Sequence, residues 1–421
     1  MKTLVQGGVV LSMDPAVGTL PRGDVLIEDG RIAAVAPALD VGGAEVVDAT
    51  GKLVLPGFVD THRHTWQTAF RGVGAGWTFD QYRTAVHGTL KPHYRPEDVY
   101  LGNLLGRLEA LSSGVTTMLD WFHCATAPEN ADAAIAGLHD APGHSIFCYG
   151  ADGPDVEPEI RRVRNLLPGD DMALGLRGPV MSTMDETAAD VALARELGLP
   201  VSTHVHGTGG WRHGDRPIAG MAERGLLDDR TTIVHGNGLS DDQLAMLADA
   251  GASVSISPDV ELKMGFEPLV AGRALAAGLR PSLSIDDCPS AGGDLFGAMR
   301  TLFAVERGIP ARDVLGFATL DGARTCGREA QTGSLTVGKD ADLVLLDADD
   351  LSVFPVGDPA GTLVSAGHPG LVDSVFVAGE AVKRDGRLLG VDLPALRARL
   401  RESRDRIAAA AGIAVDGSWV P

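Results

Sequence analysis

The sequence predicts an α/β fold, a (β/α)8 TIM barrel carrying a small composite β-sandwich domain formed by both chain ends. Residues 56–333 alternate short apolar runs with amphipathic stretches, the pattern of a parallel sheet covered by helices. Residues 1–55 and 334–390 instead alternate short β-type runs with turns, including Asp-Gly pairs. Because each end is too small for a stable sheet, we expect the two to pair. Two unrelated β extensions are the alternative.

Eight apolar runs are the predicted barrel strands: LPGFVDTH, GVTTMLDWF, HSIFCYGAD, ALGLRGPV, LPVSTHV, TTIVHG, ASVSISP and RPSLSIDD. The segment that contains them is close to the about 250 residues typical of such a barrel. An open doubly wound sheet is the alternative, but no glycine-rich phosphate-binding motif follows an early strand. Residues 391–421 are expected to add a C-terminal helix and tail.

Composition and charge exclude several classes of protein. Of the 421 residues, 44% are hydrophobic and 22% charged, which indicates a globular chain and argues against disorder. A formal charge of −20 opposes binding to nucleic acid or anionic membranes. No apolar run reaches the roughly 18–20 residues of a membrane span, and the four cysteines form no C-x-x-C pair. We therefore expect a cytoplasmic protein that acts on a small molecule.

Polar side chains cluster where the predicted barrel strands end. They are His62, His64, Asp120, Asp152, His204, His206, His235, Asp259 and Asp286. Barrel enzymes build their active sites at this end of the strands, with groups from several strands. The clustering therefore predicts an active site. The remaining histidines, His87, His93, His139, His144 and His368, are interpreted as surface or structural residues.

Two pairs of histidines have the spacing of side chains on one face of a strand. His62 and His64 form one pair, and His204 and His206 form the other. Nitrogen and carboxylate ligands with one open position suit catalytic Zn²⁺, with Fe²⁺ or Mn²⁺ as alternatives. A purely structural His-x-His is disfavoured, because histidines recur at several strand ends.

Four motifs together resemble the metal-dependent amidohydrolase superfamily, in its cytosine/guanine deaminase and triazine hydrolase (chlorohydrolase) branch. They are PGFVDTHRH, TIVHGNGLS, SLSIDD and GSLTVGKDADLVLLD, and the resemblance spans almost the whole chain. It implies that one divalent ion, most plausibly Zn²⁺, binds to His62, His64, His204 and Asp286. It also implies that His235 polarises the attacking water or the substrate, and that His206 is an additional imidazole beside the ligand His204. A homodimer is an expectation of the resemblance alone.

The sequence departs from this branch at two positions. The branch usually has H-x-x-E on the fifth strand, where the glutamate transfers a proton, but Gly207 stands three residues after His204. Either another group, with His206 the nearest candidate, protonates the substrate, or the substrate needs no such help. A packing or substrate contact is the alternative role of His206. The fourth strand ends without the lysine or glutamate that bridges two ions in binuclear relatives, which favours one metal ion.

The resemblance implies hydrolysis by metal-bound hydroxide, with Asp286 taking the proton of the water and His235 stabilising the developing charge. Trp66, Gln67, Trp121 and His123 follow the first two strands and are the predicted substrate contacts, together with His235. Trp77, Trp211 and His213 are weaker candidates. Aromatic walls with nitrogen donors suit a planar ring, although ordinary loop packing explains each residue equally well.

The leading hypothesis is a mononuclear metal-dependent hydrolase that cleaves a C–N bond of a small planar nitrogen heterocycle, as a deaminase does. The first alternative is a hydrolase of the same fold acting on an amide, cyclic amidine, carbon–halogen or N-alkyl bond, because Gly207 replaces the usual glutamate. A non-catalytic scaffold is disfavoured because all four ligand positions are filled. Asp259 and Glu261 stay open, as contacts to a cationic substrate or as loop caps.

Overall fold

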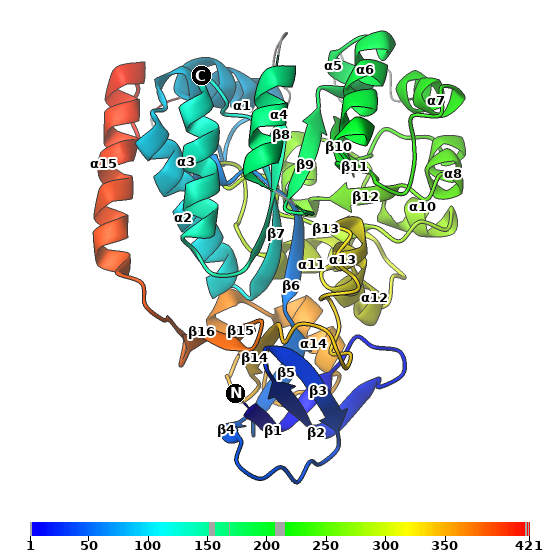
Figure 1. The fold of residues 1–421 in the computed structure, drawn as a ribbon, viewed down its shortest axis with the longest axis vertical. Coiled ribbons are helices and arrows are strands. Elements are labelled where there is room, and N and C mark those ends of the chain that lie inside the picture. Colours follow the sequence, from blue (N-terminus) through cyan, green and yellow to red (C-terminus); the bar gives the residue numbers. More distant parts are fainter. Residues whose placement is uncertain (1, 151–155, 168, 207–214, 417–418, 420) are drawn as a thin grey trace.

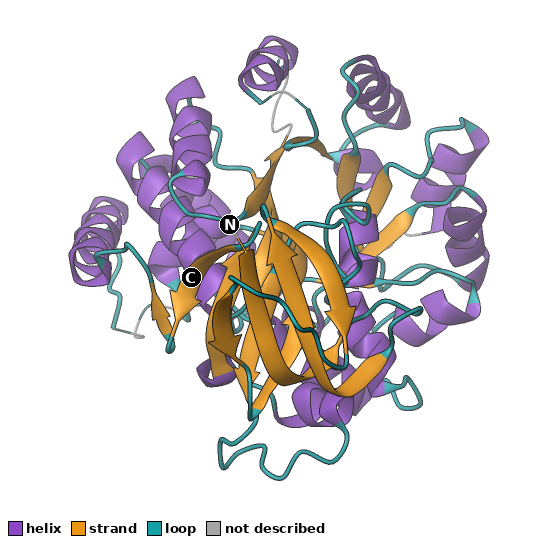
Figure 2. Cartoon of the chain, turned by 60° about the horizontal axis from the view of Figure 1, so that its bottom comes forward, coloured by secondary structure: helices purple, strands orange, loops and turns teal. Residues whose placement is uncertain are grey.

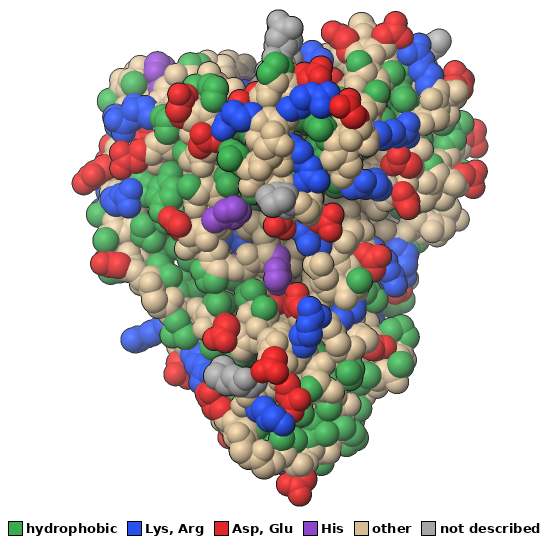
Figure 3. Space-filling model, in the orientation of Figure 1, with side chains coloured by type: hydrophobic (Ala, Val, Ile, Leu, Met, Phe, Trp, Pro, Cys, Tyr) green, Lys and Arg blue, Asp and Glu red, His purple; other side chains and the backbone are tan. Residues whose placement is uncertain are grey.

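The computed structural model describes residues 2–150, 156–167, 169–206, 215–416, 419 and 421. Four residues considered above, Asp152, Gly207, Trp211 and His213, lie outside the described residues. The described chain contains an eight-stranded sheet and a nine-stranded sheet, which lie one above the other in Figure 1. Acidic and basic side chains are interspersed over the face that Figure 3 shows.

The eight-stranded sheet is the predicted barrel. Its strands are β6 (Phe58–Arg63), β7 (Val115–Phe122), β8 (His144–Gly150), β9 (Met172–Leu176), β10 (Val201–Val205), β11 (Thr231–His235), β12 (Ser253–Ile256) and β13 (Ser282–Leu283). Each strand pairs in parallel with the next one along the chain. A parallel bridge between Arg63 and Asp286 brings the last strand back to the first. The barrel is confirmed, and each of the eight predicted runs overlaps one of its strands.

Helices follow the strands and surround the barrel in Figure 1. The longer ones are α2 (Pro96–Ser112), α3 (Pro128–His139), α4 (Glu157–Leu166), α6 (Met184–Glu196), α7 (Asp215–Glu223), α8 (Asp241–Asp249) and α11 (Leu295–Val305). Shorter ones are α5 (Gly178–Met181), α9 (Pro258–Met264), α10 (Ala271–Ala276), α12 (Ala311–Phe317), α13 (Leu320–Thr325) and α14 (Pro359–Ala366). None of the helices in the described residues combines the length and the apolar character that crossing a membrane requires.

The nine-stranded sheet confirms that both chain ends form one β-domain (Figure 2). The N-terminal part supplies β1 (Lys2–Leu11), β2 (Thr19–Glu28), β3 (Arg31–Ala36), β4 (Glu45–Asp48) and β5 (Lys52–Pro56). The C-terminal part supplies β14 (Leu343–Asp347), β15 (Val372–Val377), β16 (Glu380–Arg384) and β17 (Arg387–Leu388). The two parts join where β5 pairs antiparallel with β14. Two unrelated β extensions are therefore excluded.

Alternation along β14 explains how this domain is attached to the barrel. Leu343 and Leu345 belong to the core of the β-domain, whereas Val344 and Leu346 belong to the large core that includes the barrel. Successive side chains of a strand point to opposite faces, so one strand contributes to both cores. A hydrophobic run such as ADLVLLD is the sequence pattern of a strand buried on both faces.

The segment between β6 and α2 forms one wall of the predicted active site. It contains η1 (Thr65–Phe70), α1 (Phe79–Tyr82), η2 (Arg83–Leu90) and η3 (Lys91–His93). The C-terminal helix α15 (Leu393–Ala411) packs against α2 and all three η elements. Trp419 meets Trp77 edge to face, with ring centroids 5.1 Å apart. The end of the chain therefore holds this segment against the barrel.

An ion pair between the half-buried His144 and the buried Asp342 links the barrel to the β-domain. Asp342 accepts hydrogen bonds from Thr332 Oγ1 at 2.7 Å and Ala378 N at 2.9 Å, and its carboxylate lies 3.2 Å from His144 Nε2. Burial alone would raise the pKa of Asp342, but hydrogen bonding with His144 lowers it overall. Burial alone would lower the pKa of His144, but Asp342 raises it overall.

We expect Asp342→Asn to lower the free energy of unfolding by about 2 kcal/mol, the typical contribution of hydrogen bonds to a charged group. The carboxylate contributes its stability above its unfolded pKa near 3.8 and loses it as pH falls through the lower folded pKa. The His144 contribution is complete below 6.5 and is lost as pH rises through the raised folded pKa. Urea denaturation from below pH 3.8 to above pH 6.5 measures the loss of stability at acid pH and at higher pH, with Asp249→Asn at an exposed position as control. If Asp342→Asn lost as much stability at acid pH as the wild type does, the assignment would be contradicted.

Candidate active site

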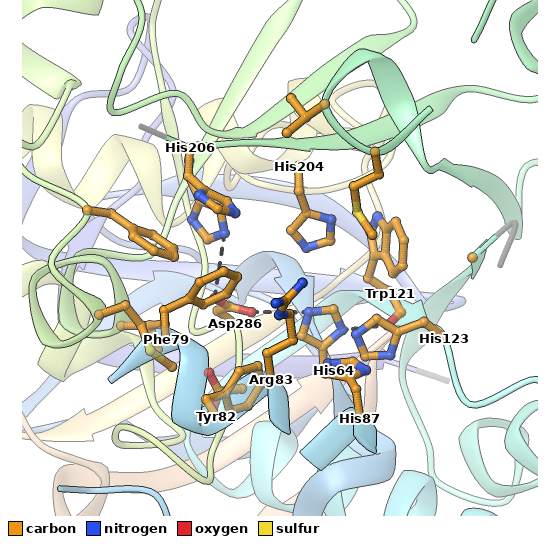
Figure 4. A pocket seen from close by; sticks show the side chains of 18 of the residues that line it. His64, Phe79, Tyr82, Arg83, His87, Trp121, His123, His204, His206 and Asp286 are labelled. Atoms are coloured by element: carbon orange, nitrogen blue, oxygen red, sulfur yellow. Dashed lines mark hydrogen bonds and ion pairs between the residues drawn. The ribbon is translucent and has the colours of Figure 1, made fainter. Parts of the chain in front are cut away.

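The C-terminal ends of the barrel strands open into a cavity of about 410 Å³. This volume falls within the roughly 300–1,000 Å³ of small-ligand sites. Its lining includes six imidazoles, four aromatic rings and two carboxylates: His64, His87, His123, His204, His206, His235, Phe79, Tyr82, Trp121, Phe266, Asp286 and Asp287. In Figure 4, His204 and His206 point into the cavity from one wall, and His64 and Tyr82 lie on the opposite wall. The structure thus brings most of the predicted strand-end residues into one cavity.

Four side chains converge at the base of this cavity with the spacing of metal ligands. His62 Nε2 lies 3.3 Å from Asp286 Oδ1 and 3.2 Å from His204 Nε2, and His64 Nε2 lies 3.2 Å from Asp286 Oδ1. Tetrahedral ligands about 2.0–2.1 Å from one ion are separated from each other by roughly 3.3 Å. The candidate ligands form two groups that share His62, one with His64 and Asp286 and the other with His204 and His235, and their spacing fits a divalent cation.

The electrostatic surroundings of His62 and His204 also suit a cation. Burial lowers the pKa of His62 to about 4, and burial beside His62 lowers the pKa of His204 well below its usual value. A neutral imidazole carries a hydrogen on one nitrogen only, so each of these two rings can present an unprotonated nitrogen to a cation. Burial alone would raise the pKa of Asp286, but hydrogen bonding with His62 and His64 holds it well below its ordinary range.

Backbone and side-chain hydrogen bonds hold the ligand atoms in place. The amide of His64 donates to Asp286 O at 2.9 Å, and the amide of Asp286 donates to His62 O at 3.0 Å. His64 Nδ1–H donates to the carbonyl of Trp121 at 2.6 Å, which leaves its Nε2 directed at Asp286, 3.2 Å away. Such outer hydrogen bonds commonly fix the tautomer of a metal-binding histidine.

His235 ends β11 with a left-handed backbone, φ 73°, and lies between two carboxylates. Its Nε2 is 3.7 Å from Asp286 Oδ2, and its Nδ1 is 3.1 Å from Glu261 Oε1. Glu261 is fully buried and also accepts from Ser257 N at 2.8 Å and Asn237 Nδ2 at 3.1 Å. Glu261 therefore orients the imidazole, with Nδ1–H directed at the carboxylate.

The neighbouring acid, Asp259, has a different position. It accepts a hydrogen bond from Thr301 Oγ1 and does not line the cavity. Of the two acids on α9, only Glu261 contacts a residue that lines the cavity. Glu261 orients His235, whereas Asp259 bonds to Thr301 outside the cavity.

His206 lies in the cavity but packs as an aromatic side chain. Its ring stacks on Phe266, with centroids 4.3 Å apart and planes 1° from parallel, and meets Phe79 edge to face. Burial, together with nearby His235, lowers the pKa of His206 to about 3. Its role as a proton carrier stays a prediction.

The predicted substrate contacts occupy two layers. Trp121 and His123 line the cavity, whereas Trp66 and Gln67 are fully buried behind it. Trp66 Nε1 donates to His123 Nδ1 at 2.9 Å, and the Gln67 amide donates to the hydroxyl of Tyr82 at 2.7 Å. Trp66 and Gln67 therefore position residues that do face the cavity.

Several lining residues escaped the sequence analysis. Phe79, Tyr82 and Phe266 lie on segments without a regular hydrophobic period, which carry little sequence signal. His87 was interpreted as a surface or structural residue, but it lines the cavity and meets His123 edge to face at 4.6 Å. That interpretation of His87 is corrected, because its helix η2 forms part of the cavity wall.

A (β/α)8 barrel with histidines and an aspartate converging at the strand ends defines the class of metal-dependent hydrolases. The model of the Amidohydrolase family matches residues 53–382, and the chain belongs to this family. It is a hydrolase that acts on carbon–nitrogen bonds other than peptide bonds.

Curated relatives cover nearly the full chain. The 5′-deoxyadenosine deaminase of Methanothermobacter thermautotrophicus is 32% identical, over 88% of this chain and 91% of that protein. The 5-methylthioadenosine/S-adenosylhomocysteine deaminase of Symbiobacterium thermophilum is 30% identical, over 96% of this chain and 99% of that protein.

Solved structures show the same architecture. A zinc-bound adenosine deaminase from Xanthomonas campestris has a TM-score of 0.87 at 26% identity, covering 97% of this chain and 98% of that one. A zinc-bound atrazine chlorohydrolase from Arthrobacter aurescens shares the fold, with a TM-score of 0.86 at 23% identity, covering 96% of this chain and 100% of that one.

Proposed function

We propose that the chain is a zinc-dependent deaminase that uses one metal ion to hydrolyse the exocyclic amine of a 6-aminopurine nucleoside. The observation that carries the proposal is that His62 groups with His64 and Asp286, and also approaches His204, at the base of an aromatic cavity. The names of the similar enzymes, which are deaminases of adenosine-type nucleosides, support the substrate class.

A single ion is supported by the residue that follows the fourth barrel strand. Arg177 lines the cavity there and lies 3.7 Å from Asp190. A guanidinium at the place where a second ion would need an anionic ligand opposes binding of that ion. Zinc is favoured over iron and manganese because the donor set is three imidazoles and one carboxylate.

In this proposal His62, His64, His204 and Asp286 hold the metal ion, which would lower the pKa of a bound water to about 7. Asp286 accepts the proton of the attacking water. His235, oriented by Glu261, presents Nε2 as a hydrogen-bond acceptor that aligns the same water beside Asp286. The aromatic walls hold the planar ring, and His206 is the candidate to protonate the leaving amine.

Release of ammonia tests this function. Metal-loaded protein is assayed with adenosine, 5′-deoxyadenosine, 5′-methylthioadenosine and S-adenosylhomocysteine, and with aminopyrimidines and aminotriazines as comparisons. We expect ammonia from the purine nucleosides. Because Gly207 cannot protonate a leaving group, hydrolysis of another bond is the second candidate function. This second function is favoured if the metal-loaded protein releases no ammonia from any compound of the panel but releases chloride or an alkylamine from triazines.

Glu261→Gln is expected to lower kcat about 10–100-fold, the usual effect of removing a group that orients a residue of a metal site. Bound metal should stay at the wild-type level, because Glu261 contacts His235 and none of the four proposed ligands. Steady-state kinetics and elemental analysis measure the two quantities. Asp259→Asn is the matched control, since Asp259 lies on the same helix and contacts Thr301 outside the cavity. Wild-type kcat in Glu261→Gln would contradict the orienting role.

A further inference from the structure

One hydrogen bond at the edge of the cavity determines which nitrogen of His123 carries a proton. The indole Nε1–H of Trp66 lies 2.9 Å from His123 Nδ1. An indole nitrogen can only donate, so Nδ1 must be the acceptor and cannot carry a hydrogen while this bond exists. The ring hydrogen of the neutral imidazole therefore resides on Nε2.

The ring that carries this hydrogen is held firmly. It stacks on His64, with centroids 4.2 Å apart and planes 12° from parallel. Edge-to-face contacts with Trp121 and His87, at centroid distances of 5.3 and 4.6 Å, fix it from two further sides. Trp66 itself is fully buried, so the donor that fixes the tautomer cannot turn toward solvent.

The second nitrogen of His123 is available to a ligand. Within the described part of the chain, the ring makes no second hydrogen bond, and His123 lines the cavity (Figure 4). A donor fixed in direction inside a small cavity favours a ligand with an acceptor opposite it and disfavours a ligand without one.

We propose that His123 is a specificity-determining residue, whose Nε2–H, held in that tautomer by Trp66, donates to an acceptor atom on the ring of the substrate. This inference rests on the proposed function, because it takes the occupant of the cavity to be a planar nitrogen heterocycle. The acceptor is a ring nitrogen or a carbonyl oxygen on the edge of the heterocycle that faces β7. A ring with carbon and hydrogen at that edge is rejected.

A binding experiment tests this recognition separately from turnover. In the zinc-loaded Asp286→Asn background, calorimetry gives the Kd of adenosine and of its 1-deaza, 3-deaza and 7-deaza analogues, each lacking one ring nitrogen. The same four ligands are measured after adding His123→Phe, which keeps an aromatic ring beside His64 but has no N–H. We expect one analogue to bind about tenfold more weakly than adenosine, and His123→Phe to abolish that difference.

His139→Phe is the control, because His139 is an exposed imidazole on α3 that does not line the cavity. It should leave the difference between adenosine and the selected analogue intact. Trp66→Phe should reduce the difference without removing the His123 ring, and ¹⁵N spectra should show that the Nε2–H tautomer no longer predominates.

If His123→Phe changes the ratio of the Kd of each analogue to that of adenosine by less than twofold, the proposal is overturned. It is also overturned if no purine binds. Ammonia release by the enzyme with intact Asp286 is recorded separately. Coupling in binding without ammonia would therefore refute deamination and leave the recognition role standing. Ammonia without coupling would refute the role of His123 and leave deamination standing.

Discussion

Asp286→Asn should lower kcat by about 10²–10⁴-fold, the range that general acid–base catalysis typically contributes. Asp286 lies 3.2–3.3 Å from two imidazoles and 3.7 Å from His235, and its pKa is held low, so at neutral pH it is an anionic acceptor beside the attacking water. An asparagine keeps the shape of the side chain but accepts no proton. Steady-state kinetics and elemental analysis on the same preparation measure turnover and metal content.

A second buried aspartate at a strand end provides the comparison. Asp120 is the acceptor for Thr65 and Asn103 and does not line the cavity. Asp120→Asn should therefore reduce thermal stability far more than kcat. Turnover within a fewfold of wild type in Asp286→Asn would show that another group takes the proton.

The fold was predictable because hydrophobic periodicity survives in a single sequence. Each barrel strand is buried on both faces and appears as an apolar run, and the strand β14 appears as a run that serves two cores. Lengths were less predictable. The run RPSLSIDD contains only the two-residue strand β13, because the chain leaves the sheet to place Asp286 with a left-handed backbone, φ 62°, against β6.

The centre of the site was predictable for a related reason. Period-two spacing places His62 and His64 on one face, and parallel strands bring the strand-end residues together at the same rim. The choice of His204 and Asp286 among those residues came from the family resemblance. The structure places His62 and His64 within 3.3 Å of Asp286, and His62 within 3.2 Å of His204.

Contacts between loops that are far apart in the sequence leave no periodic pattern in it. Glu261 and His235 are separated by 26 residues, and Trp66 and His123 by 57. A sequence shows that these residues exist, but the loops between the strands decide which of them meet. For the same reason the sequence suggested that Trp66 and Gln67 face the substrate, whereas the fold places both behind the cavity wall.

His204→Ala is expected to abolish both metal retention and activity. His204 Nε2 lies 3.2 Å from His62 Nε2, and its loss leaves three of the four donors that the cavity brings together. The metal content, measured by elemental analysis after dialysis, should fall from one ion per chain to well below one. Thermal unfolding gives an independent readout, because a metal that binds only the folded chain raises its stability by mass action. A chelator should therefore lower the Tm of wild type and leave that of His204→Ala unchanged.

His206→Ala is the sharpest comparison for this variant, since both histidines come from the end of one barrel strand. His206 stacks on Phe266 and has no place among the four converging donors. It should retain one ion per chain and the chelator-dependent shift in Tm, whatever happens to its turnover. Full metal content in His204→Ala, or loss of metal in His206→Ala, would reverse the assignment of ligand and neighbour on this strand. A reversal would remove from the proposed donor set the residue whose Nε2 lies 3.2 Å from His62 Nε2.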